Sequence, residues 1–209
     1  RVYLPILQSI NPTQDFIWFS PDAIRAFLAA GDLKSASEWL EMLNNVALMN
    51  ENATKILTGI QPLARLAGAI QDDDWSANLL SKWWQVSNVE EEENRISPEI
   101  IRSRAVLLYS LLDSLGDEVA DDEWGLLLEG PSQGTAVMPQ PALWRSLDIA
   151  SKNLRVGETI LLSLLALGQS GPALANPTVL HKVIMSLRNI GLEREARSIA
   201  VEAAVAAGL

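Results

Sequence analysis

The stretch 20–43 constrains the fold most, because its apolar residues recur at helical spacing on both sides of a single glycine. Ser20 and Pro21 are expected to begin the first helix. The serine hydroxyl can accept a hydrogen bond from a backbone N–H of the first turn, and proline fits the first helical position. Gly31 can adopt the left-handed conformation that ends a helix. The pattern therefore predicts a helix, a glycine turn and a second helix.

Each of these two predicted helices has one apolar face. The residues of the faces lie three or four positions apart, and they are Ile24, Phe27 and Leu28 in the first helix and Ala36, Trp39, Leu40 and Leu43 in the second. Two helices joined by so short a turn lie antiparallel and bury these faces against each other. One pair cannot cover both faces, so neighbouring helices are required.

The remaining sequence predicts more helices and no convincing strand, and its 48 % hydrophobic content is ordinary for a packed globule. The expected elements are a short segment 53–58 broken by Gly59 and Pro62, a helix 75–86, a long helix 98–115, a short helix 120–128, a helix from Pro141 that Gly157 turns into a second one over 158–167, and a last pair that begins at Pro177 and turns at Gly191. The fold class we predict is all-α.

The predicted turns are followed by large side chains at a constant distance. Trp39 comes eight residues after Gly31, and Trp124 comes eight residues after Gly116. The same offset leads from the other two turn glycines to Leu165 and Ile199, and Asp72 stands where a further turn glycine would be. The turns at positions 31, 72, 116, 157 and 191 are separated by 34 to 44 residues, which is the period of helix-pair repeats.

The segments AFLAAGDLKSASEWL and SLRNIGLEREARSIAVEA resemble the tetratricopeptide-like (TPR-like) helical repeat families, although no unit contains the full family consensus. The resemblance implies antiparallel helix pairs stacked as an irregular α-solenoid with a concave peptide-binding face. The alternative is a compact non-repeating helical bundle. We expect a single all-α domain over 1–209 that is a fragment of a longer chain, with possible sub-units 1–90 and 95–209 and a polar linker at 87–97.

Charge and cysteine content exclude several classes of function. A net charge of −10 argues against binding nucleic acid or an anionic membrane surface, because both require clustered Lys and Arg. No window approaches the roughly 20 apolar residues of a membrane span, so we predict no membrane insertion. The chain has no cysteine, which excludes disulfides and thiolate ligands and slightly favours a periplasmic or extracytoplasmic location over a cytoplasmic one.

Candidate catalytic and metal-binding residues all have simpler interpretations. The acidic runs 72–74, 90–93 and 121–123 lack the alternate spacing of a calcium loop, and we interpret them as solvated turns. His181 is the single histidine and lies off the apolar face of its helix, so we expect it to be exposed and inert. The sequence therefore predicts no catalytic residue, no metal site, no cofactor and no small-molecule substrate, and we expect that the protein is not an enzyme.

Tryptophan provides the candidate binding residue. Trp39 and Trp124 occupy equivalent positions after their turns and are expected to pack in the core. Trp83 and Trp84 are adjacent and lie about 100° apart around a helix, so one of them is expected outside the seam. We take Trp84 as the candidate partner-binding residue, because aromatic side chains are favoured interface anchors. The long loop 129–140 is a second place for partner recognition.

These observations favour a non-catalytic protein–protein interaction or scaffold module that presents a helical groove to another protein or to other domains of its own chain. Acidic rims on the groove would prefer a basic partner. The first alternative is a structural helical domain that packs on the rest of its own chain or self-associates. A lesser alternative is an all-α enzyme that depends on a divalent metal.

Overall fold

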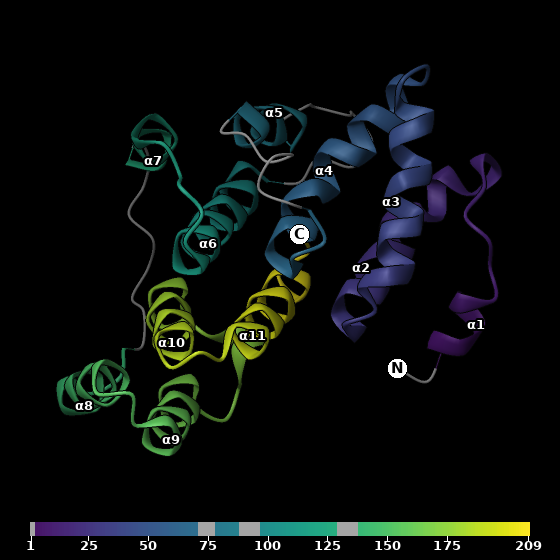
Figure 1. The fold of residues 1–209 in the computed structure, drawn as a ribbon. Coiled ribbons are helices and arrows are strands. Elements are labelled where there is room, and N and C mark those ends of the chain that lie inside the picture. Colours follow the sequence, from purple (N-terminus) through teal and green to yellow (C-terminus); the bar gives the residue numbers. More distant parts are fainter. Residues whose placement is uncertain (1–2, 71–77, 88–96, 129–137) are drawn as a thin grey trace. The chain divides into compact units, whose positions relative to one another are not determined.

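The computed structural model describes residues 3–70, 78–87, 97–128 and 138–209, and these residues form helices and connecting turns with no strand among them (Figure 1). The all-α prediction is confirmed for this part of the chain. The chain divides into two compact units, which we call the N-terminal unit (residues 1–98 with Leu209) and the C-terminal unit (residues 99–208).

In the N-terminal unit, consecutive helices pack against one another in chain order. The described elements are α1 (Leu4–Gln8), the 3-10 helix η1 (Gln14–Phe19), α2 (Ser20–Ala30), α3 (Leu33–Ala47), α4 (Glu51–Ala67) and α5 (Asn78–Ser87). The contacts run from α2 to α3, from α3 to α4 and from α4 to α5. All seven apolar residues expected on the two faces of 20–43 are buried, so the prediction of this hairpin is confirmed.

The expected role of Ser20 is wrong. Ser20 is the first residue of α2, and its Oγ donates a hydrogen bond to the carbonyl of Ile17, 2.6 Å away. No side chain caps this helix, whose N-cap residue is Phe19. Because η1 runs directly into α2, the serine hydroxyl donates its hydrogen bond to a carbonyl of the preceding turn. It does not accept a hydrogen bond from the backbone N–H groups at the start of α2.

The predicted break at Gly59 and Pro62 is also wrong, because α4 continues through both residues to Ala67. Proline has no N–H to donate and usually kinks a helix interior. Here burial of the apolar stripe of α4 outweighs this local cost. The stripe continues on both sides of the proline through the buried residues Leu57, Ile60, Leu63 and Leu66. Tertiary packing thus determines the length of this helix.

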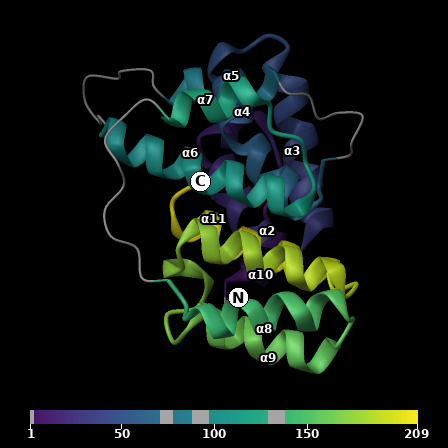
Figure 2. The ribbon, with the colours of Figure 1, turned by 90° about the vertical axis from the view of Figure 1, so that its left-hand side faces the viewer.

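The C-terminal unit contains α6 (Pro98–Leu115, whose first residue belongs to the N-terminal unit), α7 (Asp121–Leu128), α8 (Pro141–Lys152), α9 (Val156–Leu167), the 3-10 helix η3 (Pro172–Leu174), α10 (Pro177–Asn189) and α11 (Glu193–Ala206). The long helix 98–115 begins and ends where the sequence predicts. The α10–α11 hairpin lies between α6 and the α8–α9 hairpin, and both ribbon views agree on this order (Figures 1 and 2). Order in space therefore differs from order along the chain in this unit.

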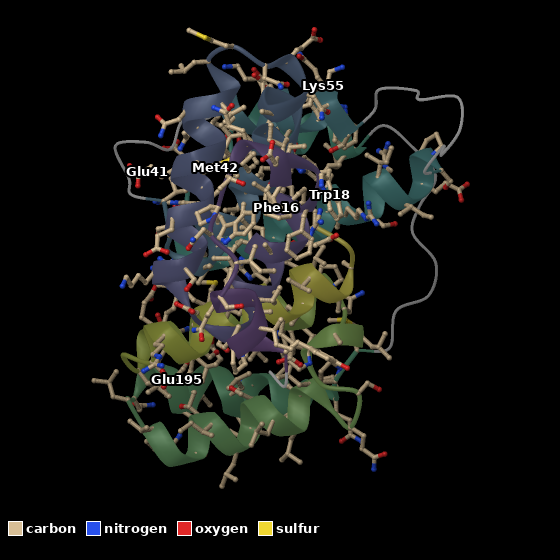
Figure 3. All side chains as sticks on the ribbon, turned by 90° about the vertical axis from the view of Figure 1, so that its right-hand side faces the viewer. Phe16, Trp18, Glu41, Met42, Lys55 and Glu195 are labelled. Carbon is tan, nitrogen blue, oxygen red and sulfur yellow. The ribbon has the colours of Figure 1, made fainter. Side chains whose placement is uncertain are left out.

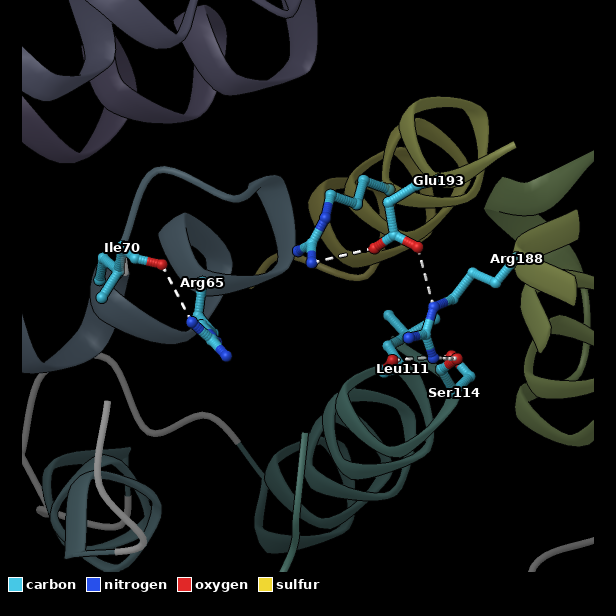
Figure 4. A network of polar contacts seen from close by, with 7 residues as sticks. Arg65, Ile70, Leu111, Ser114, Arg188 and Glu193 are labelled. Carbon is cyan, nitrogen blue, oxygen red and sulfur yellow. Dashed lines mark hydrogen bonds and ion pairs between the residues drawn. The ribbon is translucent and has the colours of Figure 1, made fainter. Parts of the chain in front are cut away.

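Polar side chains of α10 join it to α6. The guanidinium of Arg188 donates from Nη1 to the carbonyl of Ser114 and from Nε to Glu193 Oε2, both at 2.9 Å (Figure 4). Two turns of helix before Arg188 on the same side, His181 reaches Asp113 of α6. A Cβ on Gly116 would lie 2.8 Å from the guanidinium, so the glycine that ends α6 also makes room for the arginine.

The sequence predicts that Gly157 forms the turn between α8 and α9, but in the structure Leu154 forms it. Leu154 has a φ of 55°, and Gly157 lies inside α9. The closing hydrogen bond from Arg155 N to Ala150 O, at 2.9 Å, repeats the one from Asp32 N to Phe27 O after Gly31. Leu154 therefore performs the task of a C-terminal glycine, although its Cβ makes the left-handed region costly.

This turn changes the register of the repeat in α9. Counting from the left-handed residue, the fifth position is Ala36 in the first hairpin, Thr159 in α9 and Ala196 in the last hairpin, and all three are fully buried. The expected equivalence of Leu165 with Trp39 is wrong, since Leu165 is 66 % exposed and Trp39 is 2 % exposed. The predicted register of α9 is therefore shifted by three residues, because the prediction placed the turn at Gly157 and the structure has it at Leu154.

We predict that Leu154→Gly stabilises the protein by about 0.5–1 kcal/mol. The substitution removes a left-handed strain of about 1–2 kcal/mol, offset in part by about 0.4–1 kcal/mol of added unfolded-state entropy. The side chain is 64 % exposed, so little packing is lost. Urea unfolding at pH 7 measures the difference. The matched control is Gly31→Ala at φ 78° with open space around its Cβ, which should destabilise by about 1 kcal/mol. A lower midpoint for Leu154→Gly would contradict the prediction.

Candidate functional site

A groove runs along α3 on the side where the helix meets the segment before η1. Its apolar lining comes from Pro12, Met42 and Val46, and its rim carries Glu38 and Glu41. The volume is about 620 Å³, and the hollow is shallow and widely open to solvent. We call this feature, with Thr13, Gln14 and Asn45 as its remaining lining residues, the α3 groove.

Local contacts hold the elements that carry the lining residues of the α3 groove. Asp32 is the N-cap of α3: its carboxylate accepts from Ser35 N at 3.2 Å and from Ser35 Oγ at 2.7 Å, and it also accepts from Gln8 Nε2 at 2.8 Å. The hydrogen bonds from Gln8 and Ser35 lower the pKa of Asp32. The 3-10 helix η1, whose first residue Gln14 lines the groove, is held to α3 where the ring of Phe19 meets Trp39 edge-on at 5.9 Å. The groove is therefore bounded by elements that are fastened to the hairpin core.

Two exposed aromatic residues lie on η1, the helix that contributes Gln14 to the groove lining. Phe16 and Trp18 of η1 are 37 % and 72 % exposed, and the Trp18 ring lies 5.6 Å from that of Phe19. Figure 3 looks onto the side of the N-terminal unit where Glu41, Met42, Phe16 and Trp18 are labelled. An indole this exposed adds a large apolar contact with one polar N–H for a partner.

The rim of the α3 groove is negative. Glu41 is exposed and makes no ion pair within the described part of the chain, while Glu38 is paired only with Lys34 at 3.9 Å, where both side chains are exposed. A second hollow, of about 470 Å³ and lined by residues of α3 and α4, lies on the other side of Glu41. Glu41 thus stands between two hollows and offers its carboxylate to a cation.

The structure places Trp83 and Trp84 on different sides of α5, as the spacing requires. Trp83 is 4 % exposed in the core, and Trp84 is half-buried on α5. Neither the α3 groove nor the hollow beside α4 is lined by Trp84. Its role as a partner-binding residue stays a prediction. The loop 129–140, the other predicted recognition site, lies outside the described residues up to position 137.

The expectation for His181 is wrong in one respect. The side chain is only 31 % exposed, and its Nε2 lies 2.6 Å from Asp113 Oδ2. This contact bridges α10 and α6, and it explains why the histidine stands off the apolar face of its own helix. Within the described ranges, no three or more His, Cys, Asp and Glu side chains form a cluster that could hold a metal ion.

The acidic run 121–123 is only partly solvated. Asp121 and Asp122 are exposed, whereas Glu123 is 6 % exposed and accepts a hydrogen bond from the hydroxyl of Tyr109 at 2.8 Å. Burial and the Glu123 carboxylate raise the pKa of Tyr109. Trp124 meets the Tyr109 ring edge-on at 5.8 Å and is half-buried. The runs 72–74 and 90–93 lie outside the described residues.

A second apolar surface was not predicted. Leu161, Leu164 and Leu165 of α9 are 64 %, 60 % and 66 % exposed, and we call these three side chains the α9 face. The sequence signal was present, since 159–167 is the most apolar run of the chain, but it was used only to predict a helix over 158–167. The turn at Leu154, which sets the direction of this helix, was the missing observation.

Comparison with known proteins returns nothing: neither a protein-family model, nor a curated protein, nor a solved structure matches this chain. Among the described residues, every helix is too short or too polar to cross a membrane. The functional proposal therefore depends on the surfaces of the molecule.

Asp148 of α8 supplies a pH-dependent contact in the C-terminal unit. Its carboxylate lies 2.8 Å from Lys152 Nζ and 2.5 Å from Lys182 Nζ of α10. The hydrogen bonds from Lys152 and Lys182 lower the pKa of Asp148 from 3.8 to about 2. Since the folded-state pKa is depressed, the contact stabilises the protein above pH 3.8, and this stabilisation is lost as the pH falls towards 2.

We predict that Asp148→Asn lowers the free energy of unfolding at pH 7 by less than about 1 kcal/mol, because solvent screens a pair that is one-third exposed on the aspartate side. At pH 2 the difference between wild type and variant should shrink, since about half of the wild-type carboxylate is then protonated. Urea unfolding at the two pH values measures it. Glu41→Gln, which removes an exposed carboxylate with no ion pair among the described residues, is the control for the loss of a surface charge. A gap that stays constant with pH would contradict the prediction.

Proposed function

We propose that this protein is a non-catalytic interaction module whose α3 groove binds a basic segment of a partner protein. The observation that carries the proposal is the apolar lining of Pro12, Met42 and Val46 beneath the carboxylates of Glu38 and Glu41. Such a surface accepts an apolar side chain in its floor and Lys or Arg side chains at its rim.

The chemistry of the α3 groove defines the kind of segment it fits. The volume admits one or two apolar side chains, and the unpaired Glu41 favours a cation beside them. Trp18 would extend the contact, since an exposed indole can stack on an aliphatic or guanidinium side chain. Because the glutamates are exposed, their attraction should act mainly on the association rate and should weaken with salt.

The architecture of the N-terminal unit supports this proposal. Helices α2 to α5 pack in chain order, as in the TPR-like arrays that the sequence resembles, and we propose that this unit is a short, irregular array of that kind. Stacked helix pairs commonly bind extended or helical peptides on one surface. Because the C-terminal unit is not stacked in chain order, the proposal of an array is limited to the N-terminal unit.

The test is selection of binders from a random library of displayed 12-residue peptides at low salt. Peptides that combine Lys or Arg with one large apolar residue should be enriched. For a selected peptide, Glu38→Gln with Glu41→Gln should raise Kd about tenfold, the sum of two exposed charge contacts of under about 1 kcal/mol each. The difference should fall at 0.5 M salt.

The matched control is Glu195→Gln with Glu202→Gln on α11, which removes two exposed carboxylates that make no ion pair among the described residues (Glu195 is labelled in Figure 3). This double variant should leave the Kd unchanged within about twofold. Enrichment of acidic or uncharged peptides, or an equal loss of affinity in both double variants, would overturn the proposed function.

Two further variants separate the candidate aromatic anchors. We predict that Trp18→Ala raises the Kd of the selected peptide by at least tenfold, since interface tryptophans commonly contribute about 2 kcal/mol. Trp84→Ala should change it less, because Trp84 belongs to α5, which contributes no lining residue, whereas Trp18 belongs to η1, whose first residue Gln14 lines the groove. Isothermal titration measures both, and thermal melts show whether each variant is folded. A larger effect from Trp84→Ala would move the binding site to α5.

A further inference from the structure

Helix α9 has its apolar and polar sides exchanged. Thr159, Ser163 and Leu167 form its buried face, and Ser163 Oγ finds no hydrogen-bond partner among the described residues. Leu161, Leu164 and Leu165 lie on the opposite face, more than half exposed. A helix that belongs to a core normally buries its leucines and exposes its hydroxyls. The α9 face is thus suited to contact with another molecule.

The position of α9 leaves this face uncovered within the C-terminal unit. The α8–α9 hairpin packs on α10 with its inner side, and it lies on the far side of the α10–α11 hairpin from α6 (Figures 1 and 2). Terminal helix pairs of stacked arrays usually carry a polar outer face. Here the outermost helix of the unit presents leucine.

We propose that the α9 face is a homodimer interface, in which α9 packs antiparallel against α9 of a second copy of this chain. This proposal does not depend on the function proposed for the α3 groove.

Charge is the first reason for choosing a second copy. Two chains of net charge −10 repel each other wherever their acidic surfaces meet. The α9 face avoids this cost: the one charged residue on the exposed side of the helix is Glu158, and Arg155 neutralises it at 2.8 Å. A basic partner would gain nothing from this surface, in contrast to the α3 groove.

Symmetry is the second reason. A two-fold interface needs a patch that complements itself. A two-fold axis passing α9 at the level of residue 163, close to the middle of the helix, brings Leu161 of one copy opposite Leu165 of the other, and Leu164 of both copies lies beside the axis. Leucines four residues apart on one helix then interdigitate with the same pair on the second.

The size of the α9 face sets the expected strength. Three leucines offer less than the roughly 800 Å² that each partner buries in a standard stable interface, so the dimer should be weak, with a Kd of about 10–100 μM. Sedimentation equilibrium from 5 to 200 μM should therefore show a monomer at the lower end and a dimer at the upper end. A monomer at all concentrations would overturn the proposal.

Leu161→Glu with Leu165→Glu places like charges opposite each other across the two-fold axis, and it should weaken dimerisation at least 100-fold. The matched control is Leu126→Glu with Leu128→Glu on α7, where the same change is made at residues 45 % and 85 % exposed in the same unit. The control should dimerise like the wild type. An unaffected dimer in the first variant, or an equal loss in the control, would overturn the proposal. Circular dichroism confirms that each variant is folded.

A cysteine test works even if the glutamate variant does not fold. The natural chain has no cysteine, so a single substitution gives a unique thiol. Chains with Leu161→Cys are mixed with size-tagged chains carrying Leu165→Cys, and the mixture is oxidised at 100 μM. Random pairing of equal amounts gives twice as much mixed disulfide dimer as either self-linked dimer. In the proposed arrangement, the ratio of mixed dimer to each self-linked dimer should exceed two. A chance distribution, or no disulfide at all, would overturn the antiparallel arrangement.

Discussion

The left-handed residue that ends the first helix of a hairpin determines how the second helix is turned. After Gly31, Leu154 and Gly191, a backbone N–H closes on the carbonyl five residues earlier, at 2.9, 2.9 and 3.0 Å. The next helix then begins two residues after the left-handed one, so the same side faces inward each time. Small residues occupy the innermost position in all three hairpins, because only they permit close contact of the paired helices.

In α9, this geometry conflicts with the hydrophobic pattern. The turn at Leu154 directs Thr159 and Ser163 inward, although the helix contains five leucines. The leucines that remain outside form the α9 face. The exposure of these leucines in a single chain is thus a direct consequence of a hydrogen-bonded turn. In the proposed dimer, the second chain buries them.

The two candidate surfaces differ in the forces they can use. The α3 groove combines apolar side chains with the unpaired carboxylate of Glu41, and it therefore discriminates by charge. The α9 face is neutral and depends on apolar contact alone. Both surfaces lie beside well-packed hairpins, where Trp39 and Thr159 are buried, so neither requires a rearrangement of the core before binding.

The sequence was sufficient to predict the helical class, the hairpin 20–43 and the long helix 98–115, because the spacing of apolar residues and the turn glycines are local signals. It did not reveal that α4 runs through Pro62, that Glu123 and His181 have partners 14 and 68 residues away, or that α10–α11 lies between α6 and α8–α9. Those features depend on contacts between distant residues. The α3 groove and the α9 face belong to this second group, since a surface exists only once the tertiary structure has decided which side of each helix is covered.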